Sequence, residues 1–387
     1  MTRLAVVGRD GLIRVSDEAL EEWRELSPPE FKSLWPTWSP DGSLLAYSRF
    51  RPPTNGDLRL GVYVSMPDRG SGRDVHVNQP GTDAISEGTP HYMLWSPDGS
   101  TIAIVAQTLG KGLTLFLADG AGANASKEVL GGGPLFVSWS HDSRYLLAHA
   151  HQLHYLVNSE SRDVAQVPVT SQYYMSPCWS PVRPEMAMLG ELVGSRQALM
   201  LGNVDEGGSR ILTEIEGAVA MAYRPDGEAI AICRELDRGM GYYSGLWIYD
   251  AITGEGVRIY DGRLLSFFWS PDGSMIALVV PSEAGEGSIR WATLELESRN
   301  VSYHGDFRPS RSQLTMFMFF DQYRQSHTPW SPDGSRLVFA GELGHQTLRT
   351  ALPSDDATDV FVLETSAGDT AQISEGTLGT WSPVSDA

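Results

Sequence analysis

The sequence has little that would tie it to a disulfide framework, a membrane or a nucleic acid. Its 387 residues include two cysteines, Cys178 and Cys233, which are too few for a disulfide framework and lack the Cys-x-x-Cys spacing of zinc or redox sites. No apolar stretch approaches the roughly 18 residues that a membrane span needs. Lys and Arg number 29 against 48 Asp and Glu, and the resulting net charge of −19 disfavours binding to phosphate backbones and anionic membranes.

Signals for export and for hydrolase chemistry are also missing. Met1 leads straight into the apolar run 4–7, which has neither the length nor the cleavage site of a signal peptide. The sequence therefore predicts a cytoplasmic protein, or an extracytoplasmic one if a leader has been removed. A Gly-x-Ser-x-Gly nucleophile elbow is absent, because the nearest approach, 241–245, carries its serine one place too late. This excludes a serine peptidase.

The chain does carry a repeated phrase, in which an aromatic residue is followed by Ser-Pro and usually by Asp-Gly. Its eight copies begin at Trp38, Trp95, Trp139, Trp179, Tyr223, Trp269, Trp330 and Trp381. The intervals between these aromatic residues are 57, 44, 40, 44, 46, 61 and 51 residues. A period of about 40–50 residues built from short strands indicates a propeller blade. Because no long segment shows helical periodicity, we predict an all-β fold.

The copy at Trp95 shows the expected blade of four antiparallel strands. Residues 91–96 form the first strand and 97–100 a tight turn, and the other strands follow at 101–106, 113–118 and 127–130. An Asp-Gly pair favours such a turn, because glycine accepts a positive φ and the Asp side chain accepts hydrogen bonds from backbone amides. The second strands align nine residues beyond each aromatic residue, at Tyr47, Ile104, Ala148, Met188, Ile232, Leu278 and Phe339.

The two ends of the chain complete one blade together. Strand-like runs at 4–8, 12–16 and 22–27 precede the first motif, and the last motif, at 379–383, has no strands after it. Pairing of this segment with the N-terminal strands closes the ring without an exposed sheet edge. We therefore predict one eight-bladed β-propeller domain over 1–387, with seven blades and one motif copy outside the ring as the alternative.

The repeated WSPDGS, followed by apolar runs such as TIAIVA (101–106) and RLVFAG (336–341), resembles the TolB-type, WD-repeat-like β-propeller family. Similar blades form the propeller domains of the prolyl oligopeptidase and dipeptidyl peptidase class. The resemblance covers nearly the whole chain. It implies a propeller that binds proteins or peptides, and it implies no shared chemistry. The additional α/β domains of TolB and of the peptidases have no counterpart in the sequence.

A ligand or partner is expected at the channel mouth formed by the loops that follow the second strands, since propellers bind through loops on a rigid ring. Glu191, Glu235 and Glu342 fall at one level of this mouth and could hold a cation, an amine terminus or a basic side chain. The alternative is that they are solvated strand ends. The other candidates at this mouth are Arg49, Tyr92 and His151.

The segment 307–329 departs most from the repeat and makes the interval before Trp330 the longest. We expect a helix with Ser312 as its N-cap. Its apolar face would carry Leu314, Phe317, Met318 and Tyr323. The register places this insert at the channel mouth, where Asp321, Tyr323 and His327 would contact a ligand or partner. The alternative is a plug whose apolar residues fill the channel and whose polar residues bond to backbone.

His149, His151 and His154 form the sequence's metal-like cluster, which His91 and His327 could join from other loops. Some propeller lyases that act on uronates use His-rich manganese sites, so a metal enzyme is one alternative. The other is that these histidines pack on or beside a strand. The aspartates of the Asp-Gly turns are expected to form turns, because one carboxylate per turn gives too few oxygens for a calcium cage.

The sequence thus predicts a non-catalytic propeller scaffold that binds a protein, peptide or small ligand at the channel mouth. The expected partner is a protein or peptide, the expected oligomeric state is a monomer, and no cofactor is expected. The alternative is a metal-dependent carbohydrate-active enzyme, lyase-like, with a divalent metal on the histidines. A structural subunit of a larger assembly is the third possibility.

Overall fold

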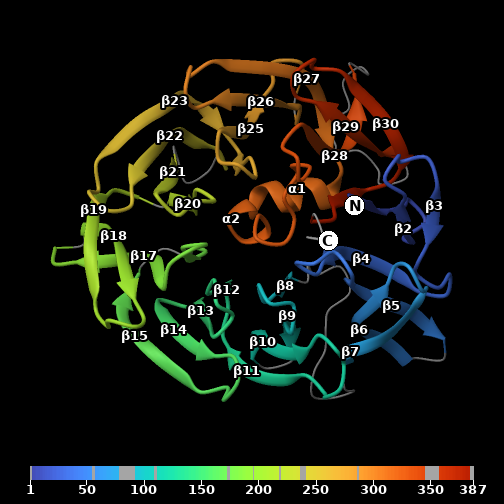
Figure 1. The fold of residues 1–387 in the computed structure, drawn as a ribbon, viewed down its shortest axis with the longest axis horizontal. Coiled ribbons are helices and arrows are strands. Elements are labelled where there is room, and N and C mark those ends of the chain that lie inside the picture. Colours follow the sequence, from blue (N-terminus) through green and yellow to red (C-terminus); the bar gives the residue numbers. More distant parts are fainter. Residues whose placement is uncertain are drawn as a thin grey trace.

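A computed structural model of the chain shows a closed ring of β-sheets with two short helices at its centre (Figure 1). It describes residues 2–54, 57–77, 92–108, 111–171, 175–194, 196–217, 219–235, 241–285, 287–344 and 357–383.

The first four blades follow one another around the ring. Blade 1 consists of β31 (Leu378–Trp381), β1 (Leu4–Val7), β2 (Ile13–Ser16) and β3 (Trp23–Glu25). Blade 2 consists of β4 (Lys32–Trp38), β5 (Leu45–Thr54), β6 (Asp57–Met66) and β7 (Ser71–Val77). Blade 3 consists of β8 (Tyr92–Trp95), β9 (Thr101–Thr108), β10 (Gly112–Asp119) and β11 (Lys127–Gly131). Blade 4 consists of β12 (Leu135–Trp139), β13 (Tyr145–Ala150), β14 (Leu153–Asn158) and β15 (Val164–Thr170).

The other four blades complete the circle. Blade 5 consists of β16 (Cys178–Trp179), β17 (Glu185–Leu192), β18 (Arg196–Asn203) and β19 (Ser209–Ile215). Blade 6 consists of β20 (Val219–Tyr223), β21 (Ala229–Glu235), β22 (Tyr243–Asp250) and β23 (Gly256–Leu264). Blade 7 consists of β24 (Ser266–Trp269), β25 (Met275–Pro281), β26 (Ile289–Glu295) and β27 (Val301–Pro309). Blade 8 consists of β28 (Arg336–Leu343), β29 (Asp359–Glu364) and β30 (Thr370–Glu375).

Blade 8 lacks a regular inner strand, and Trp330 takes that place through an isolated bridge to Leu337. The blade is joined to blade 7 because the end of β27 pairs with the end of β28, which produces one seven-stranded sheet. Blade 1 is completed by β31, which pairs antiparallel with β1 from Leu4↔Trp381 to Val7↔Leu378. The predicted eight-bladed ring, closed by pairing of the chain ends, is confirmed.

Residues at equivalent positions of the repeat occupy equivalent positions in the core. The seven residues that lie nine positions beyond a motif aromatic are all buried, with relative exposures of 0–1%: Tyr47, Ile104, Ala148, Met188, Ile232, Leu278 and Phe339. Large side chains at one level of successive blades therefore pack face to face between sheets. The predicted strand register is confirmed.

The motif aspartates bond within their own turns, as predicted. In the turn after Trp269, the hydroxyl of Ser270 donates to Asp272 Oδ1 at 2.6 Å, and the hydroxyl of Ser274 donates to Oδ2 at 2.7 Å. The hydrogen bond from Ser270, followed by those from Ser274, lowers the pKa of Asp272 below its ordinary value of 3.8. Turns of this kind carry a lowered carboxyl pKa at Asp41, Asp98, Asp142, Asp226, Asp272 and Asp333.

A lowered carboxyl pKa makes the stability of these turns sensitive to acid. The folded-state pKa lies below the unfolded one, so the stabilisation is present above about pH 4 and is lost as the pH falls through the folded-state value. We expect Asp272→Asn to reduce the free energy of unfolding at pH 7 by about 0.5–1.5 kcal/mol. The deficit should shrink as urea unfolding is repeated from pH 5 down to pH 2. Glu297→Gln, at an exposed turn position, is the control. A deficit independent of pH would contradict the role of the charge.

The motif tryptophans join each blade to the one before it. In six copies the indole Nε1 donates to the carbonyl of the residue that precedes the previous blade's motif aromatic. These bonds are Trp38 to Thr380, Trp95 to Thr37, Trp139 to Leu94, Trp269 to Ala222, Trp330 to Phe268 and Trp381 to Pro329, at 3.0–3.3 Å. The first of them closes the ring between blades 2 and 1. Trp179 is different, since its buried Nε1 has no hydrogen-bond partner among the described residues.

The insert before Trp330 forms α1 (Arg311–Met318) and α2 (Phe320–Tyr323), which lie in the middle of the ring (Figure 1). The predicted helix is present, but its N-cap is wrong. Ser310 caps α1, because its hydroxyl accepts from the N–H of Gln313 at 3.0 Å. Met318 does not share the buried face with Phe317, since it is the last residue of α1 and is 54% exposed. The turn between the two helices reorients the chain at this point.

Candidate functional site

The insert touches every blade of the ring. Four contacts are hydrogen bonds to backbone groups of blades 1, 8, 5 and 4: Ser310 Oγ to Thr377 O, Ala340 N to Gln313 Oε1, Ser176 N to Asp321 Oδ2 and Val137 N to Gln322 Oε1, at 2.5–3.1 Å. The other four are ring contacts with blades 2, 3, 6 and 7: Tyr323 with Trp35 and with Tyr92, and Phe320 with Tyr243 and with Phe267, at centroid distances of 4.7–6.0 Å.

These contacts make the insert a plug, the second of the two alternatives that the sequence left open. Phe317 and Phe320 have no exposed surface. The side chain of Gln322 binds both backbone groups of Val137, because its Nε2 also donates to the Val137 carbonyl at 2.9 Å. The channel-facing edge of β12 is thereby satisfied, as buried backbone groups require.

The predicted contact residues of the insert lie inside this plug. Asp321, Tyr323 and His327 are 9%, 3% and 1% exposed. Burial raises the pKa of Asp321, although the N–H of Ser176 bonds to its carboxylate and opposes the shift. Burial also lowers the pKa of His327 to about 3. The structure brings Trp35, Tyr92 and His327 together around Tyr323, as an aromatic cluster.

The other predicted contact residues are dispersed around the ring. Arg49 is held within blade 2, where it pairs with Asp74 at 2.6 Å and lies over the rings of Phe31 and Tyr63. His151, Glu191 and Glu342 stand at the far ends of the second strands, on three different blades. Glu235 ends β21, and its side chain lies outside the described part of the chain. A common ligand of these residues stays a prediction.

Two of the predicted histidines of blade 4 form a buried pair, whereas His151 is exposed. His149 and His154 stack with their ring centroids 4.4 Å apart, and their Nδ1 atoms lie 2.8 Å and 3.0 Å from the carbonyls of Met175 and Val169. Burial lowers the pKa of His149, and burial together with His149 lowers that of His154 to about 4. His91 lies outside the described residues. Among those described, no group of three or more His, Cys, Asp or Glu side chains is arranged to hold a metal ion.

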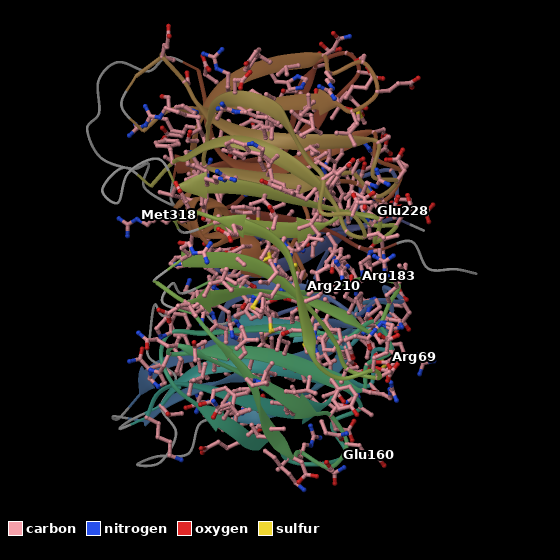
Figure 2. All side chains as sticks on the ribbon, turned by 90° about the vertical axis from the view of Figure 1, so that its left-hand side faces the viewer. Arg69, Glu160, Arg183, Arg210, Glu228 and Met318 are labelled. Carbon is pink, nitrogen blue, oxygen red and sulfur yellow. The ribbon has the colours of Figure 1, made fainter. Side chains whose placement is uncertain are left out.

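The two mouths of the channel are very different. We call the face that carries the motif turns the Asp-Gly face, and the opposite one the insert face. Met318 of the insert lies at one side of the ring, whereas Arg183 and Glu228, which belong to motif turns, lie at the other (Figure 2). The insert enters from the insert face, and its last residues reach toward the Asp-Gly face.

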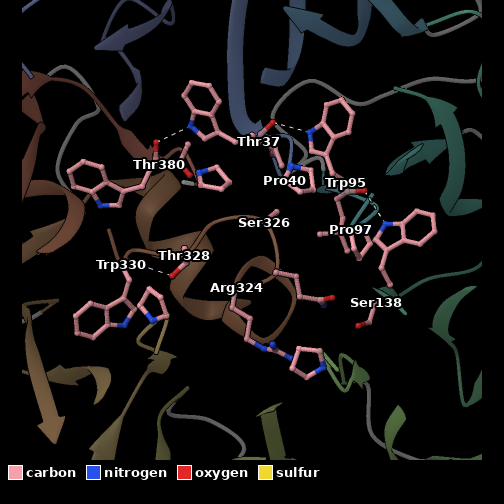
Figure 3. Close-up of a pocket in the computed structure, with 18 of the residues that line it drawn as sticks. Thr37, Pro40, Trp95, Pro97, Ser138, Arg324, Ser326, Thr328, Trp330 and Thr380 are labelled. Carbon is pink, nitrogen blue, oxygen red and sulfur yellow. Dashed lines mark hydrogen bonds between the residues drawn. The ribbon is translucent and has the colours of Figure 1, made fainter. Parts of the chain in front are cut away.

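A cavity of about 720 Å³ opens at the Asp-Gly face. Its wall is the repeat itself, since seven of the eight motif copies contribute to it and the copy at Tyr223 does not. The motif tryptophans in this wall are Trp38, Trp95, Trp139, Trp179, Trp330 and Trp381. The residues at the proline position of the motif are Pro40, Pro97, His141, Pro181, Pro271, Pro332 and Pro383. The floor comes from the tail of the insert (Figure 3).

The floor is polar and contains one charged residue. It consists of Arg324, Gln325, Ser326 and Thr328. Arg324 follows α2, and its backbone N–H donates to the Phe320 carbonyl at 2.8 Å. In Figure 3 its side chain runs from the centre of the cavity residues toward their lower edge. An apolar wall with a few convergent polar groups is the usual composition of a ligand site.

Sequence reasoning missed this cavity because it treated the motif residues as structural. Five of the tryptophans both bond to the neighbouring blade and line the cavity: Trp38, Trp95, Trp139, Trp330 and Trp381. A signal was present in the repeat, since blade 5 replaces Asp-Gly by Val182-Arg183 and blade 4 replaces proline by His141. These replacements lie in the motif turns, and they indicate that the blades differ from one another on the Asp-Gly face.

The fold and the plugged channel define the chain as an eight-bladed β-propeller. The dihydro-heme d1 dehydrogenase NirN is 12% identical and has a TM-score of 0.61, with 100% of this chain and 75% of that one covered. Porphyromonas gingivalis dipeptidyl peptidase 4 is 11% identical, with a TM-score of 0.56 and coverage of 96% and 59%. TolB from Acinetobacter baumannii is 16% identical, with a TM-score of 0.45 and coverage of 88% and 83%.

These similarities concern the fold. The expected resemblance to β-propellers, among them one of the dipeptidyl peptidase kind, is confirmed at that level. No protein-family model and no curated protein matches the sequence. Among the described residues, no helix has the length and apolar character needed to cross a membrane.

Proposed function

We propose that this protein is a propeller scaffold that binds a peptide segment or a small ligand in the cavity at its Asp-Gly face. The observation that carries the proposal is the cavity of about 720 Å³, walled by motif tryptophans and prolines and floored by the insert. Its volume lies in the usual range of ligand sites, about 300–1,000 Å³. The proposal keeps the function predicted from the sequence and moves the binding site to the opposite mouth.

The rigidity of the walls supports this function. Five of the six wall tryptophans are fixed by their bonds to neighbouring blades. The floor is fixed by the bonds of the insert, including that of Gln325 Nε2 to the Val137 carbonyl at 3.1 Å. A preorganised site loses less conformational entropy on binding than a flexible one. Aromatic side chains offer a large contact area at a low entropic cost.

The test blocks each mouth in turn. Peptides that bind the intact chain are first selected from a random peptide library, and their affinities are measured by calorimetry. Thr328 is an exposed residue of the cavity floor, so Thr328→Trp should weaken binding by about tenfold or more, because the larger ring occupies the ligand's space. Met318→Trp at the insert face is the matched control and should leave the affinities unchanged.

Two results would overturn the assignment. If binding survives Thr328→Trp and is lost in Met318→Trp, the site lies at the insert face. If the selected peptides bind both variants and the parent chain equally, the channel is not the site at all. Both variants should retain the thermal midpoint of the parent chain, which separates a blocked site from a damaged fold.

A further inference from the structure

We propose that the cavity recognises a single carboxylate group through Arg324. This inference rests on the proposed function, and it adds the chemical class of the ligand. Arg324 is the one formally charged residue in the described lining, which contains no Asp, Glu or Lys. The cavity therefore carries a positive centre within a chain whose net charge is −19.

The guanidinium of Arg324 is the floor group whose hydrogen bonds the protein leaves incomplete. Gln325 bonds to Val137, Ser326 Oγ lies 2.8 Å from His327 Nδ1, and Thr328 Oγ1 accepts from the N–H of Trp330. Nε and Nη2 of Arg324 are buried and have no hydrogen-bond partner among the described residues. A buried charge without a partner is costly, so such a group is normally matched by an opposite charge.

Nearby groups of the protein match this charge only in part. The carboxylate of Asp321 accepts from the N–H groups of Ser176 and Gln322, and no ion pair within 4.0 Å joins it to Arg324 in the described structure. Cys178, also in the wall, stays a thiol at neutral pH, because burial raises its pKa to about 11 even though the charge of Arg324 and a side-chain hydrogen bond with it oppose this shift. A neutral thiol does not balance the charge of the guanidinium.

The positions of the two unsatisfied nitrogens indicate which chemical group could accept their hydrogen bonds. Nε and Nη2 lie along one edge of the guanidinium, and their N–H bonds point the same way, which is the edge that binds both oxygens of a carboxylate. Both nitrogens are buried, so we infer that the side chain turns toward the cavity when a ligand binds. One guanidinium balances one negative charge, so a monocarboxylate fits better than a phosphate dianion.

The same sector of the ring contains the motif tryptophan that lacks its usual partner. Trp179 lines the cavity, and its Nε1 is buried and unbonded within the described structure, while six other motif tryptophans donate to the preceding blade. Two residues with unsatisfied buried donors therefore line one cavity. The apolar wall around them suits the body of the ligand, for which two sources are possible: a small organic acid and the C-terminus of a peptide.

The experiment uses matched acids and amides. The small probes are 1-naphthoate and 1-naphthamide, and the peptide probes are acetyl-Ala-Leu-Phe with a free and with an amidated C-terminus. Binding to the full chain is followed by tryptophan fluorescence, because six tryptophans line the cavity, and by calorimetry. We expect each acid to bind about 10- to 100-fold more tightly than its amide. The tighter of the two acids identifies the source.

Arg324→Gln should remove this preference for the acid while leaving the amide affinity unchanged. Arg324→Lys should restore part of it, because lysine keeps the charge and loses the planar pair of donors. Arg311→Gln, at an exposed position of α1, is the control. Because Arg324→Gln removes an unpaired buried charge, the thermal midpoint should stay the same or rise. A fall of the midpoint would indicate a folding defect.

Three outcomes would overturn the inference. They are equal binding of acid and amide, an acid preference that survives Arg324→Gln, and no binding of either acid at millimolar concentration. The proposed function fails separately. If selected peptides lose binding in Thr328→Trp and not in Arg324→Gln, the cavity is a binding site without carboxylate recognition.

Discussion

Replacement of Phe320 by alanine is expected to lower the free energy of unfolding by about 3–5 kcal/mol, as is usual for a buried phenylalanine. Phe320 is 0% exposed and packs against Phe267 of blade 7, with ring centroids 5.0 Å apart, and against Phe268 and Tyr243. The substitution opens a cavity at the centre of the ring, among the aromatic side chains that pack against Phe320. Urea unfolding followed by tryptophan fluorescence measures the loss.

Phe319, the residue before Phe320, provides the matched control. Phe319 is 46% exposed, so Phe319→Ala removes a ring of the same size without emptying a packed site. It should change the free energy of unfolding by about 0.5 kcal/mol or less. Equal losses in the two variants would show that the insert contributes through its helices and not through the burial of Phe320, and would contradict its role as a plug.

Removal of β31 should have the largest effect of any change considered. A chain that ends at Gly376 loses the buried side chains of Leu378 and Trp381 and exposes the inner edge of β1. Loss of these two side chains costs about 5–10 kcal/mol, which is comparable to the whole stability of a typical domain. We expect this chain to be largely unfolded or aggregated at 25 °C by circular dichroism and size-exclusion chromatography, since an open strand edge favours association.

A chain that ends at Pro383 retains β31 and serves as the control, with an unchanged thermal midpoint. Addition of a synthetic peptide of residues 377–387 to the shorter chain should restore native circular dichroism, because the closing strand can pair without a covalent link. If the chain that ends at Gly376 keeps its thermal midpoint within a few degrees, pairing of the chain ends does not hold the ring together.

The fold could be predicted from the sequence because the repeat is redundant. Eight copies of one motif fix the blade, and the buried residue nine positions later fixes the strand register. The closing pair of β1 and β31 follows from the phase of the repeat at the two ends. Each inference depends on local spacing, which the structure preserves.

The site could not be predicted in the same way, because it depends on where non-repeating residues lie relative to the ring. The sequence placed the insert at the correct mouth, but the burial of Asp321, Tyr323 and His327 is set by contacts with strands far away in the chain. No sequence pattern around Arg324 indicates a binding role for this residue. Its significance comes from the cavity above it and from the lack of a partner for its Nε and Nη2 in the described structure.

The contact of one insert with all eight blades changes how the ring holds together. In most repeat proteins each unit touches only its neighbours, so stability is a sum of local terms and the units at the ends can open alone. Here residues 310–323 lie against every blade, and opening any blade removes a contact of the shared centre. The blades are thereby coupled across the diameter as well as around the circumference, and we expect the array to unfold as one cooperative unit.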